Sequence, residues 1–370
     1  MRAAGDFLKK NAVLCAAILA AAATSVAVPP DAAYLGYFDF KTLSCLFCVL
    51  AVVCALKDVR FFYWLAHRVV QICKNLRLCA TALVYITFVG SMLIANDMAL
   101  LTFLPLGCLV LTETGSERYM APLFVLQNIA ANLGGMLTPF GNPQNLYLYT
   151  RFSIPTGEFL SIMAPSFLLS LALFTVCCFL FFPAETVRVP PEEIRIPAAR
   201  TALYLALFAL SVVMVFRVIP YWIGLLVIPA ALLLLDRRAL AAVDYPLLLT
   251  FVFFFIFAGN MARIAPVRAW IAGLLSWNTL AVSTLSCQFI SNVPSAILLS
   301  QFTDNYPALL IGVNIGGTGT LIASLASLIT FREYTRHNPG KTGRYLVFFS
   351  ALSFAFLGVL YLFNALTAPL

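Results

Sequence analysis

Two stretches of this chain carry the same order of asparagine, glycine and threonine residues. Asn132-Leu-Gly-Gly-Met-Leu-Thr138 aligns with Asn314-Ile-Gly-Gly-Thr-Gly-Thr320 at an offset of 182 residues. The same register pairs further amide and hydroxyl side chains, Asn142 with Ser324 and Asn145 with Ser327. Upstream of each stretch lies a second matched motif, Ala95-Asn96-Asp97 and Ser291-Asn292-Val293. The repetition predicts a site built from two similar halves.

Glycine and proline interrupt both stretches within otherwise apolar runs. These residues do not fit an uninterrupted helix: Gly134, Gly135, Pro139, Gly141 and Pro143 in the first stretch, and Gly312, Gly316, Gly317 and Gly319 in the second. Paired interruptions at membrane depth are typical of the central site of a transporter. Half-helix N-termini there attract an anion or a polar solute, whereas carbonyl, Asn, Ser and Thr oxygens suit a cation. A Gly-Gly pair also permits close helix packing, but two matched sets favour a binding site.

A single acidic residue falls at predicted mid-membrane depth. Asp97 lies at the tip of a predicted hairpin, whereas the other fourteen Asp and Glu residues fall near span ends, in loops or on a surface helix. An ionised carboxylate at that depth is costly unless it is paired, hydrated or bound to a cation, so it is typical of ion or proton paths. Val293 occupies the matching position, which makes any charge chemistry asymmetric. The alternative is a structural carboxylate held by local backbone N–H groups.

The elements that must position these residues are membrane helices. Of 370 residues, 62% are hydrophobic and 10% are charged, and the mean hydropathy is +0.96. Soluble domains have about half apolar and about a quarter charged residues. The composition therefore indicates an all-α polytopic membrane protein. It excludes a nucleic-acid-binding protein, a large soluble catalytic domain and a disulfide-stapled secreted fold. The ten cysteines lie in or beside apolar runs and are interpreted as small hydrophobic residues.

Hydropathy predicts nine spans and two re-entrant hairpins, arranged as two inverted repeats. The first repeat, 1–183, contains spans 11–29 and 40–56, a surface helix 57–77, hairpin 78–110, broken helix 119–150 and span 159–182. Residues 184–220 form a linker and a connecting span. The second repeat, 221–370, contains spans 221–236 and 244–260, hairpin 277–300, broken helix 307–330 and span 344–366. Segment 57–77 is amphipathic, which predicts a helix in the membrane surface with His67 on its solvated face.

The distribution of positive charge predicts the orientation of the chain. With the N-terminus in the cytoplasm and each hairpin returning to its own side, eighteen of the 23 Lys and Arg residues face the cytoplasm. Five remain outside: Lys41, Arg151, Arg217, Arg263 and Arg268. This asymmetry follows the positive-inside rule and places the C-terminus outside. We expect the inner (cell) membrane of a bacterium, with 57–77 and 331–343 on the cytoplasmic side and 151–158 and 301–306 outside.

These motifs resemble those of the ion transporter superfamily, which includes arsenite permeases, divalent-anion/sodium symporters, citrate transporters and a class of sodium/proton antiporters. The resemblance rests on Thr-Pro-Phe-Gly-Asn-Pro-Gln-Asn-Leu at 138–146, Ala-Asn-Asp-x-Ala-Leu-Leu-x-x-Leu-Pro at 95–105 and Ser-Asn-Val-Pro-Ser at 291–295. It implies a scaffold domain, a mobile transport domain of hairpins and broken helices, elevator-type alternating access and, in many members, a homodimer. The tips depart from the Ser-Asn-Thr of the sodium-dicarboxylate branch, and Ala-Asn-Asp is closer to the arsenite permeases.

Carried over by position, the resemblance implies a site at the two hairpin tips and the two breaks. Its members are amide, hydroxyl, carboxyl and glycine positions: Asn96, Asp97, Asn132, Gly134, Gly135, Thr138, Gly141, Asn142, Asn145, Ser291, Asn292, Ser295, Asn314, Gly316, Gly317, Thr318, Thr320, Ser324 and Ser327. Sodium at Asn96 and Asn292 is the alternative to a site without metal. We place no Lys or Arg at mid-membrane depth, so helix dipoles, hydroxyls and amides would hold an anion there, with Asp97 opposing it.

The resulting hypothesis is a secondary active transporter of a small inorganic or organic anion, of the arsenite or carboxylate class. It is coupled to sodium ions or protons and uses no other cofactor. The alternative within the fold is a sodium/proton antiporter centred on Asp97, and a channel fits inverted broken repeats less well. An enzyme is disfavoured because His67 and His337 lie in polar surface segments and no His-x-x-x-His or Gly-x-Ser-x-Gly motif occurs. The expected partners are the solute, the lipid bilayer and a second copy of the chain, but not nucleic acid.

Overall fold

The protein is built from α-helices joined by short loops and three 3₁₀ segments. The computed structural model describes residues 11–187 and 194–367, and no strand occurs among these residues. Within the same ranges, eight helical segments are long and apolar enough to cross a membrane. The predicted class, an all-α polytopic membrane protein, is confirmed.

The helix boundaries follow the predicted runs with a few shifts. Before the linker lie α2 (Ala12–Ala27), α3 (Phe40–Asp58), α4 (Phe61–Gln71), α5 (Leu76–Ile94), α6 (Asn96–Glu113), α7 (Met120–Gly134), α8 (Pro143–Arg151) and α9 (Thr156–Phe181). After it lie α10 (Ala198–Val215), α11 (Tyr221–Leu235), α12 (Arg237–Ala241), α13 (Tyr245–Arg263), α14 (Ala265–Ile290), α15 (Asn292–Leu299), α16 (Tyr306–Ile315), α17 (Leu325–His337) and α18 (Thr342–Thr367). The 3₁₀ segments are η1 (Ala32–Tyr37), η2 (Glu117–Tyr119) and η3 (Gly135–Leu137).

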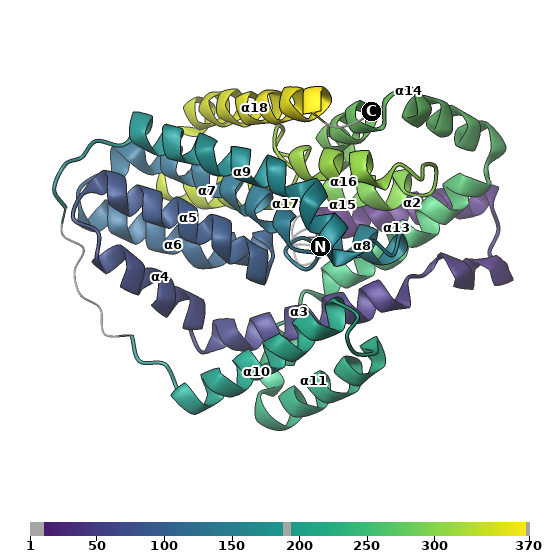
Figure 1. Ribbon diagram of the computed structural model, residues 1–370, viewed down its shortest axis with the longest axis horizontal. Helices are drawn as coiled ribbons and strands as arrows, with labels where there is room; N and C mark the ends of the chain where they lie inside the picture. Colours follow the sequence, from purple (N-terminus) through teal and green to yellow (C-terminus); the bar gives the residue numbers. More distant parts are fainter. Residues whose placement is uncertain (1–10, 188–193, 368–370) are drawn as a thin grey trace.

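The helices form two groups with different packing partners. In the support group, α2, α3 and α10–α13, helix α2 packs along α13, and α3 packs against α10 and α11. In the hairpin group, α5–α9 and α14–α18, helix α5 packs on α6 and α7, and α14 packs on α15 and α16. Figure 1 shows α3, α10 and α11 along the lower edge of the molecule and α9 and α18 along the upper edge. The groups meet where α3 contacts α8 and α13 contacts α15.

The two hairpins turn in the same way at matched residues. Ala95 separates α5 from α6 with φ 62° and ψ 151°, and Ser291 separates α14 from α15 with φ 73° and ψ 162°. This region of backbone space is essentially reserved for glycine. In each tip the next asparagine accepts a hydrogen bond from the N–H group that follows it, at 3.0 Å for Asn96 Oδ1 and 2.9 Å for Asn292 Oδ1. Both tips therefore share one strained, side-chain-capped turn.

The two breaks are also anchored in the same way. Thr138 Oγ1 donates to the carbonyl of Met92 at 2.7 Å, and Thr320 Oγ1 donates to the carbonyl of Gln288 at 3.0 Å. Each acceptor lies in the hairpin of its own half, four residues before the tip asparagine. The two halves therefore share a fastening between break and hairpin as well as a sequence motif. The repeat boundaries 1–183 and 221–370 and the re-entrant course of the hairpins stay predictions.

The surface helix differs from its prediction. Helix α4 covers Phe61–Gln71, a shorter segment than 57–77, because α3 continues to Asp58 and Arg60 takes a left-handed conformation with φ 57°. His67 is 2% exposed, so the prediction of a solvated imidazole is wrong. The physical reason is that α4 packs against α3, α5 and α6, and its buried face includes position 67. Hairpin 277–300 also differs from its prediction, because α14 begins upstream at Ala265 and kinks at Asn278.

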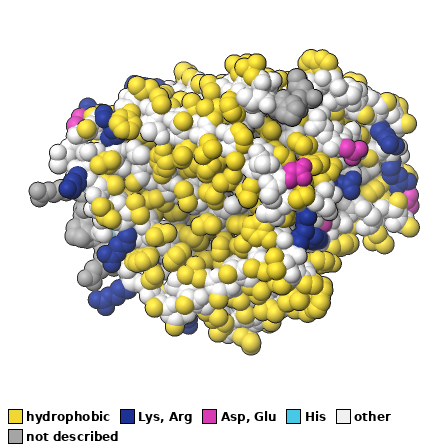
Figure 2. All heavy atoms as spheres, in the orientation of Figure 1, with side chains coloured by type: hydrophobic (Ala, Val, Ile, Leu, Met, Phe, Trp, Pro, Cys, Tyr) yellow, Lys and Arg dark blue, Asp and Glu magenta, His cyan; other side chains and the backbone are white. Residues whose placement is uncertain are grey.

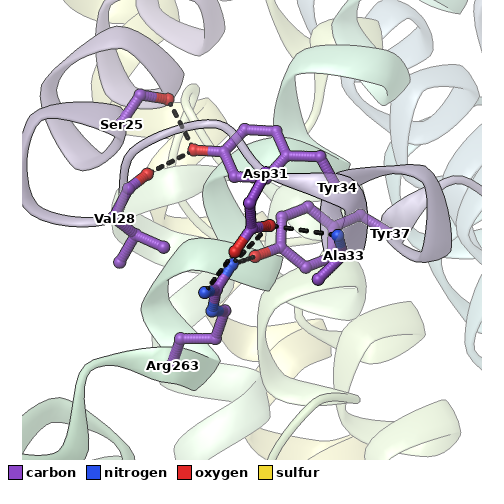
Figure 3. Close-up of polar contacts among 7 residues, drawn as sticks. All are labelled: Ser25, Val28, Asp31, Ala33, Tyr34, Tyr37 and Arg263. Carbon is purple, nitrogen blue, oxygen red and sulfur yellow. Dashed lines mark hydrogen bonds and ion pairs between the residues drawn. The ribbon is translucent and has the colours of Figure 1, made fainter.

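The loop between α2 and α3 is clamped onto the end of α13. Arg263 donates to both carboxylate oxygens of Asp31, at 3.0 and 2.7 Å, and to the Tyr37 hydroxyl at 3.1 Å (Figure 3). The Tyr37 ring lies over Gly259, where an added Cβ would approach it to 2.5 Å. The hydrogen bonds from Arg263 lower the pKa of Asp31 below its usual value. This clamp, which includes η1, covers the end of the α2/α13 pair.

Charged side chains gather at opposite ends of the molecule. Figure 2 shows Lys and Arg side chains mainly at the left end and both signs of charge at the right end, with hydrophobic side chains across the middle. In the same orientation, the α4/α5 junction lies at the left end and the α13/α14 junction at the right (Figure 1). An apolar belt between two charged ends is the arrangement that a bilayer requires.

Candidate functional site

A cavity of about 300 Å³ lies where the support group meets the hairpin group. Both hairpin tips form part of its wall, at 95–98 and 291–294. The first residues of α8 and α17 form another part. The support group contributes side chains of α2, α3 and α13: Leu14, Leu50, Asp244, Leu247 and Thr250. Both matched motifs of the sequence therefore border one space.

Four helices of the hairpin group begin at the wall of this cavity. Helix α6 begins at Asn96, α15 at Asn292, α8 at Pro143 and α17 at Leu325, and each of these residues lines the cavity. A helix N-terminus carries a partial positive charge and backbone N–H groups without an intrahelical partner. Four such ends around one cavity favour a negatively charged solute.

The tip asparagines are bonded to the breaks of both halves. Asn96 Nδ2 donates to Asn132 Oδ1 in α7 at 3.2 Å and to Ser324 Oγ at 3.5 Å. The second tip reaches the same group, because a Cβ added at Gly317 would lie 3.1 Å from Asn292 Nδ2 and 3.6 Å from Asn132 Oδ1. The glycine leaves room for both asparagines, since a Cβ would press on Asn292. The structure thus brings together predicted site residues from positions almost 200 residues apart.

A second set of amides crosses between the halves. Asn314 Nδ2 donates to Asn145 Oδ1 at 2.6 Å, and Asn314 Oδ1 accepts from Asn142 Nδ2 and Gln144 Nε2, each at 3.4 Å. All four side chains are at most 1% exposed. The end of α16 is therefore joined to the beginning of α8 by amide–amide hydrogen bonds. Gln144 lines the cavity and is a residue that the sequence analysis did not select, although it lies within the quoted motif 138–146.

Three buried oxygens at this site have no hydrogen-bond partner among the described residues. They are Asp97 Oδ1, Asn142 Oδ1 and Gln144 Oε1, and Asp97 and Gln144 also line the cavity. A buried acceptor without a donor costs about 1–3 kcal/mol. Since all three are acceptors, a cation or a donor-bearing solute is what they lack.

The carbonyls of the two breaks already have donors within the protein. Asn145 Nδ2 donates to the carbonyls of Gly135, Met136 and Thr138, at 3.1, 3.2 and 3.4 Å. In the second half, Gln288 Nε2 donates to the carbonyls of Gly316 and Thr318, at 2.8 and 3.1 Å. Different residues therefore satisfy the equivalent carbonyls of Met136 and Thr318, and Gln288 was not predicted. Its signal was its place four residues before the tip asparagine.

The remaining predicted residues have local partners. Three hydroxyls are bonded within their own segments or to α7: Ser295 to the carbonyl of Ser291 at 2.7 Å, Thr318 to the carbonyl of Ile315 at 2.6 Å, and Ser327 to Asn128 Nδ2 at 3.2 Å. At Gly134 an added Cβ would lie 2.0 Å from the carbonyl oxygen of Phe88, so close packing of α7 on α5 explains that glycine. Gly141 lies in the first break, beside Gly135.

A cation, Arg332, lies on the wall of the cavity, although no Lys or Arg is predicted at this depth. Arg332 lines it together with Leu325, Leu328 and Ile329, because these positions of α17 share one helix face. Asp244, the N-cap of α13, lies on the support-group side of the cavity. The charge distribution predicts Arg332 in the cytoplasmic segment 331–343, whereas its spacing of seven residues from Leu325 is the signal for this helix face. The cavity thus has two acidic side chains and one basic side chain on its wall.

Comparison with known proteins places the chain in a family. Residues 7–308 match the sequence profile described as citrate transporter. An uncharacterized transporter of Methanocaldococcus jannaschii is 31% identical over 311 residues, which cover 84% of each chain. The inner membrane protein YbiR of Escherichia coli is 30% identical over 307 residues, which cover 80% of each chain. A further uncharacterized transporter, from Mycobacterium tuberculosis, is 28% identical over 171 residues, 45% of this chain and 39% of the relative. The chain is a membrane transporter and belongs to the citrate transporter family of the ion transporter superfamily.

Proposed function

We propose that this chain is a secondary active transporter of a small inorganic or organic anion, of the carboxylate or arsenite class. The observation that carries the proposal is the meeting of four helix N-termini at one cavity between two groups of helices. Their partial positive charges are fixed by the fold and act without a buried Lys or Arg at the tips. Arg332 adds a full positive charge to the same wall.

An elevator-type movement fits the division of contacts. The tips and breaks are bonded to one another within the hairpin group, whereas the support group contributes mainly apolar side chains to the cavity. A solute held by tips and breaks can then travel with the hairpin group past an apolar surface. Helix α4 and the part of α14 before the kink at Asn278 connect the two groups in the chain.

The unpaired oxygens support ion coupling. Asp97 Oδ1 and Gln144 Oε1 line the cavity and lack donors among the described residues. Sodium takes oxygen ligands, and a proton on Asp97 would make its carboxyl group neutral. Either ion lowers the repulsion between Asp97 and an anion held at the helix N-termini. Coupling by sodium ions or protons follows from the same geometry, and no other cofactor is proposed.

The family description favours the carboxylate class. The profile that matches residues 7–308 is described as citrate transporter, and tricarboxylates or dicarboxylates suit several N-termini better than a single charge does. The Ala-Asn-Asp tip is the feature that supports arsenite. We propose a carboxylate as the first substrate to test.

The second candidate function is sodium/proton antiport centred on Asp97. It is favoured by one observation, the unpaired Asp97 Oδ1 at the cavity wall. In that case the cavity would exchange cations and no anion would be needed. The two functions differ in whether an anion accumulates.

Reconstituted protein separates them. Proteoliposomes receive imposed sodium or proton gradients and a panel of arsenite, citrate, succinate and phosphate. Accumulation of one labelled anion against its gradient supports anion transport. Sodium/proton exchange without movement of any anion in the panel supports antiport and overturns the first proposal.

Variants at the tip and break locate the site. Asn142→Ala and Asn292→Ala are expected to abolish transport while membrane insertion and thermal stability remain close to wild type. The matched control is Asn364→Ala, which removes an equally buried asparagine that bonds Ser166, in α9. If Asn142→Ala and Asn292→Ala both transport normally, the site lies elsewhere.

Asp97→Asn tests the coupling. The amide mimics the neutral carboxyl group, so the variant is expected to bind the anion but to lose accumulation driven by a gradient, leaving exchange or downhill flux. Uptake of labelled anion is measured with and without the gradient. Gradient-driven accumulation by Asp97→Asn would make the carboxylate structural.

The proposed setting is the inner membrane of a bacterium, with the N-terminus in the cytoplasm and the chain as a homodimer. Eighteen of the 23 Lys and Arg residues support this orientation, and one relative carries the name inner membrane protein. Single cysteines at 331–343 and 151–158, labelled with an impermeant reagent in intact cells, test it. Labelling of 331–343 from outside would contradict the proposed orientation.

A further inference from the structure

A second cavity lies at the opposite end of α8 from the central one. It has a volume of about 440 Å³ and is lined by the segment 36–41, by Tyr147, Thr150 and Arg151 of α8, and by Gln301. Phe255 and Gly259 of α13 complete the wall. The segments 36–41 and 151–153 belong to the face that the charge distribution assigns to the outside.

This second cavity carries an excess of positive charge. Lys41 and Arg151 line it, and neither side chain forms an ion pair within residues 11–187 and 194–367. The carboxylate of Asp39 also lines it but is engaged at the start of α3, where it accepts from Thr42 N at 2.9 Å and from Thr42 Oγ1 at 2.6 Å. The net charge that the cavity presents to solvent is therefore positive.

The other cations of the same face are placed differently. Arg263 is paired with Asp31, and Arg217 donates to backbone carbonyls of Tyr149 and Ile154. Arg268 lies outside the second cavity, on a neighbouring hollow of the surface that Arg151 also borders. Lys41 and Arg151 are thus the two predicted outside cations that line this cavity, and Arg268 is a matched reference.

A single layer separates the two cavities along α8. Gln144 lines the central cavity and Tyr147 lines the second one, a rise of about 4.5 Å along a helix. Tyr147 is 1% exposed. Its hydroxyl bonds Ser300 Oγ at 2.8 Å and accepts from Gln301 Nε2 at 3.1 Å, and its ring packs on Phe255 with centroids 5.5 Å apart. Tyr147 of α8 therefore contacts both the end of hairpin 277–300 and α13, and its side chain fills the layer between the two cavities.

We propose that the second cavity is an anion-docking vestibule on the outer face, in which Lys41 and Arg151 attract the solute and Tyr147 forms the floor toward the central cavity. The inference rests on the proposed function, because it assumes that the solute is an anion. The vestibule recognises negative charge on a small solute. The two ends of α8 then lie on one route, with its C-terminal turn at the vestibule and its N-terminus at the central cavity.

Neutralisation of the two cations tests the vestibule. The proteoliposomes contain wild type, the double variant Lys41→Gln/Arg151→Gln or the control Arg268→Gln. An impermeant reagent inactivates the protein molecules inserted in one of the two orientations, so that uptake reports on the other orientation alone. Initial uptake of the transported anion of the panel is measured from the vestibule side at low ionic strength. The double variant is expected to raise KM about tenfold, since charged clefts raise encounter rates by about 10–10³. The maximal rate and the control Arg268→Gln are expected to stay at wild-type values.

Salt and direction of flux complete the test. At about 1 M salt the Debye length falls to about 3 Å, so the KM of the double variant is expected to approach that of wild type. Flux from the opposite side is expected to be unchanged. Arg151→Lys keeps the positive charge, so its KM is expected to stay close to that of wild type. A normal KM in this variant excludes a folding defect as the cause of the change in the double variant.

The outcomes separate this inference from the proposed function. An unchanged KM in the double variant, with transport intact, overturns the vestibule and leaves anion transport standing. An equal change in Arg268→Gln also overturns it, because the effect would then belong to the whole face. If wild type carries cations and no anion of the panel, the proposed function fails, and the anion vestibule that rests on it fails with it.

Discussion

The conformation of Ala95 makes a stability prediction that can be worked from the structure. Its φ of 62° and ψ of 151° lie in the region that side chains with a Cβ avoid, at a cost of about 1–3 kcal/mol. Ala95→Gly removes that cost. It also adds conformational freedom to the unfolded chain, worth about 0.4–1 kcal/mol, and deletes one methyl group of a residue that is 8% exposed, worth about 0.8 kcal/mol. The net free-energy change is therefore small.

A matched alanine in the same hairpin isolates the strain. Ala99 is 0% exposed and lies one turn into α6, with ordinary helical geometry. Ala99→Gly pays the same methyl and entropy costs without relief, so it is expected to destabilise by about 1–2 kcal/mol. The expected difference between the two variants is the strain itself, about 1–3 kcal/mol in favour of Ala95→Gly.

Reversible unfolding in mixed micelles measures both variants against wild type. For a chain of this size, 1 kcal/mol corresponds to about 1–2 °C in Tm by the usual entropy per residue, so unfolding by denaturant is the more sensitive assay. Equal destabilisation by Ala95→Gly and Ala99→Gly would refute the claim that the tip stores strain.

Two further predictions follow from contacts outside the cavity. Arg263 lowers the pKa of Asp31 below its usual 3.8, so their interaction stabilises the fold above that pH, and the contribution is lost as pH falls through the lowered value. The Tm measured from pH 6 downward is therefore expected to fall more steeply for wild type than for Asp31→Asn. Parallel curves would contradict the prediction. Gly312→Ala is expected to destabilise the protein, since the added Cβ would lie 1.9 Å from Ser283 Oγ. Gly358→Ala, with nothing within 4 Å of the added Cβ, is expected to stabilise its helix by up to about 1 kcal/mol. If Gly312→Ala also loses no stability, α14 and α16 can separate at no cost.

The sequence was sufficient to predict elements whose signals are local. Glycine, proline and the matched motifs located both breaks, and the apolar runs located most helices within a few residues. The tips were predicted at the correct residues because an asparagine next to a second polar residue inside an apolar run has few other uses. Their strained backbone was not foreseen, since Ala95 and Ser291 are not residues that favour positive φ.

Features that depend on packing between distant segments could not be predicted in the same way. Gln288 donates to a break that begins 28 residues later, and its place four residues before the tip asparagine marks the position but not this partner. His67 was misplaced because the amphipathic pattern of 57–77 describes one helix in isolation, whereas α4 is packed on three others. Arg332 was assigned to a loop by counting charges, but its helix begins early enough to place it on the cavity wall.

The two halves differ in how tightly each hairpin is joined to its own break. Hairpin 277–300 is bonded to the second break through Gln288, which donates to two carbonyls and accepts from Thr320 N at 2.9 Å, and through the tip, where Asn292 N donates to the carbonyl of Ala323 at 3.0 Å. The first break instead has its carbonyls satisfied by Asn145 of α8. It is bonded to hairpin 78–110 through Thr138, and α7 adds Asn132, which accepts from Asn96. Gln127 of α7 also donates to Thr87 Oγ1 and to the carbonyl of Phe103 in the same hairpin.

Each such hydrogen bond contributes about 0.5–1.5 kcal/mol net. Separation of the second hairpin from its break therefore leaves buried carbonyls without their donor Gln288. Separation of the first breaks the bonds of Thr138, Asn132 and Gln127, but the three carbonyls that Asn145 satisfies keep their donor. The sequence repeat is symmetric, but the source of the carbonyl donors is not. Asp97, the one carboxylate at a tip, lies on the hairpin whose break is satisfied from α8, so an ion bound there acts on a hairpin that can shift without depriving those carbonyls of their donor.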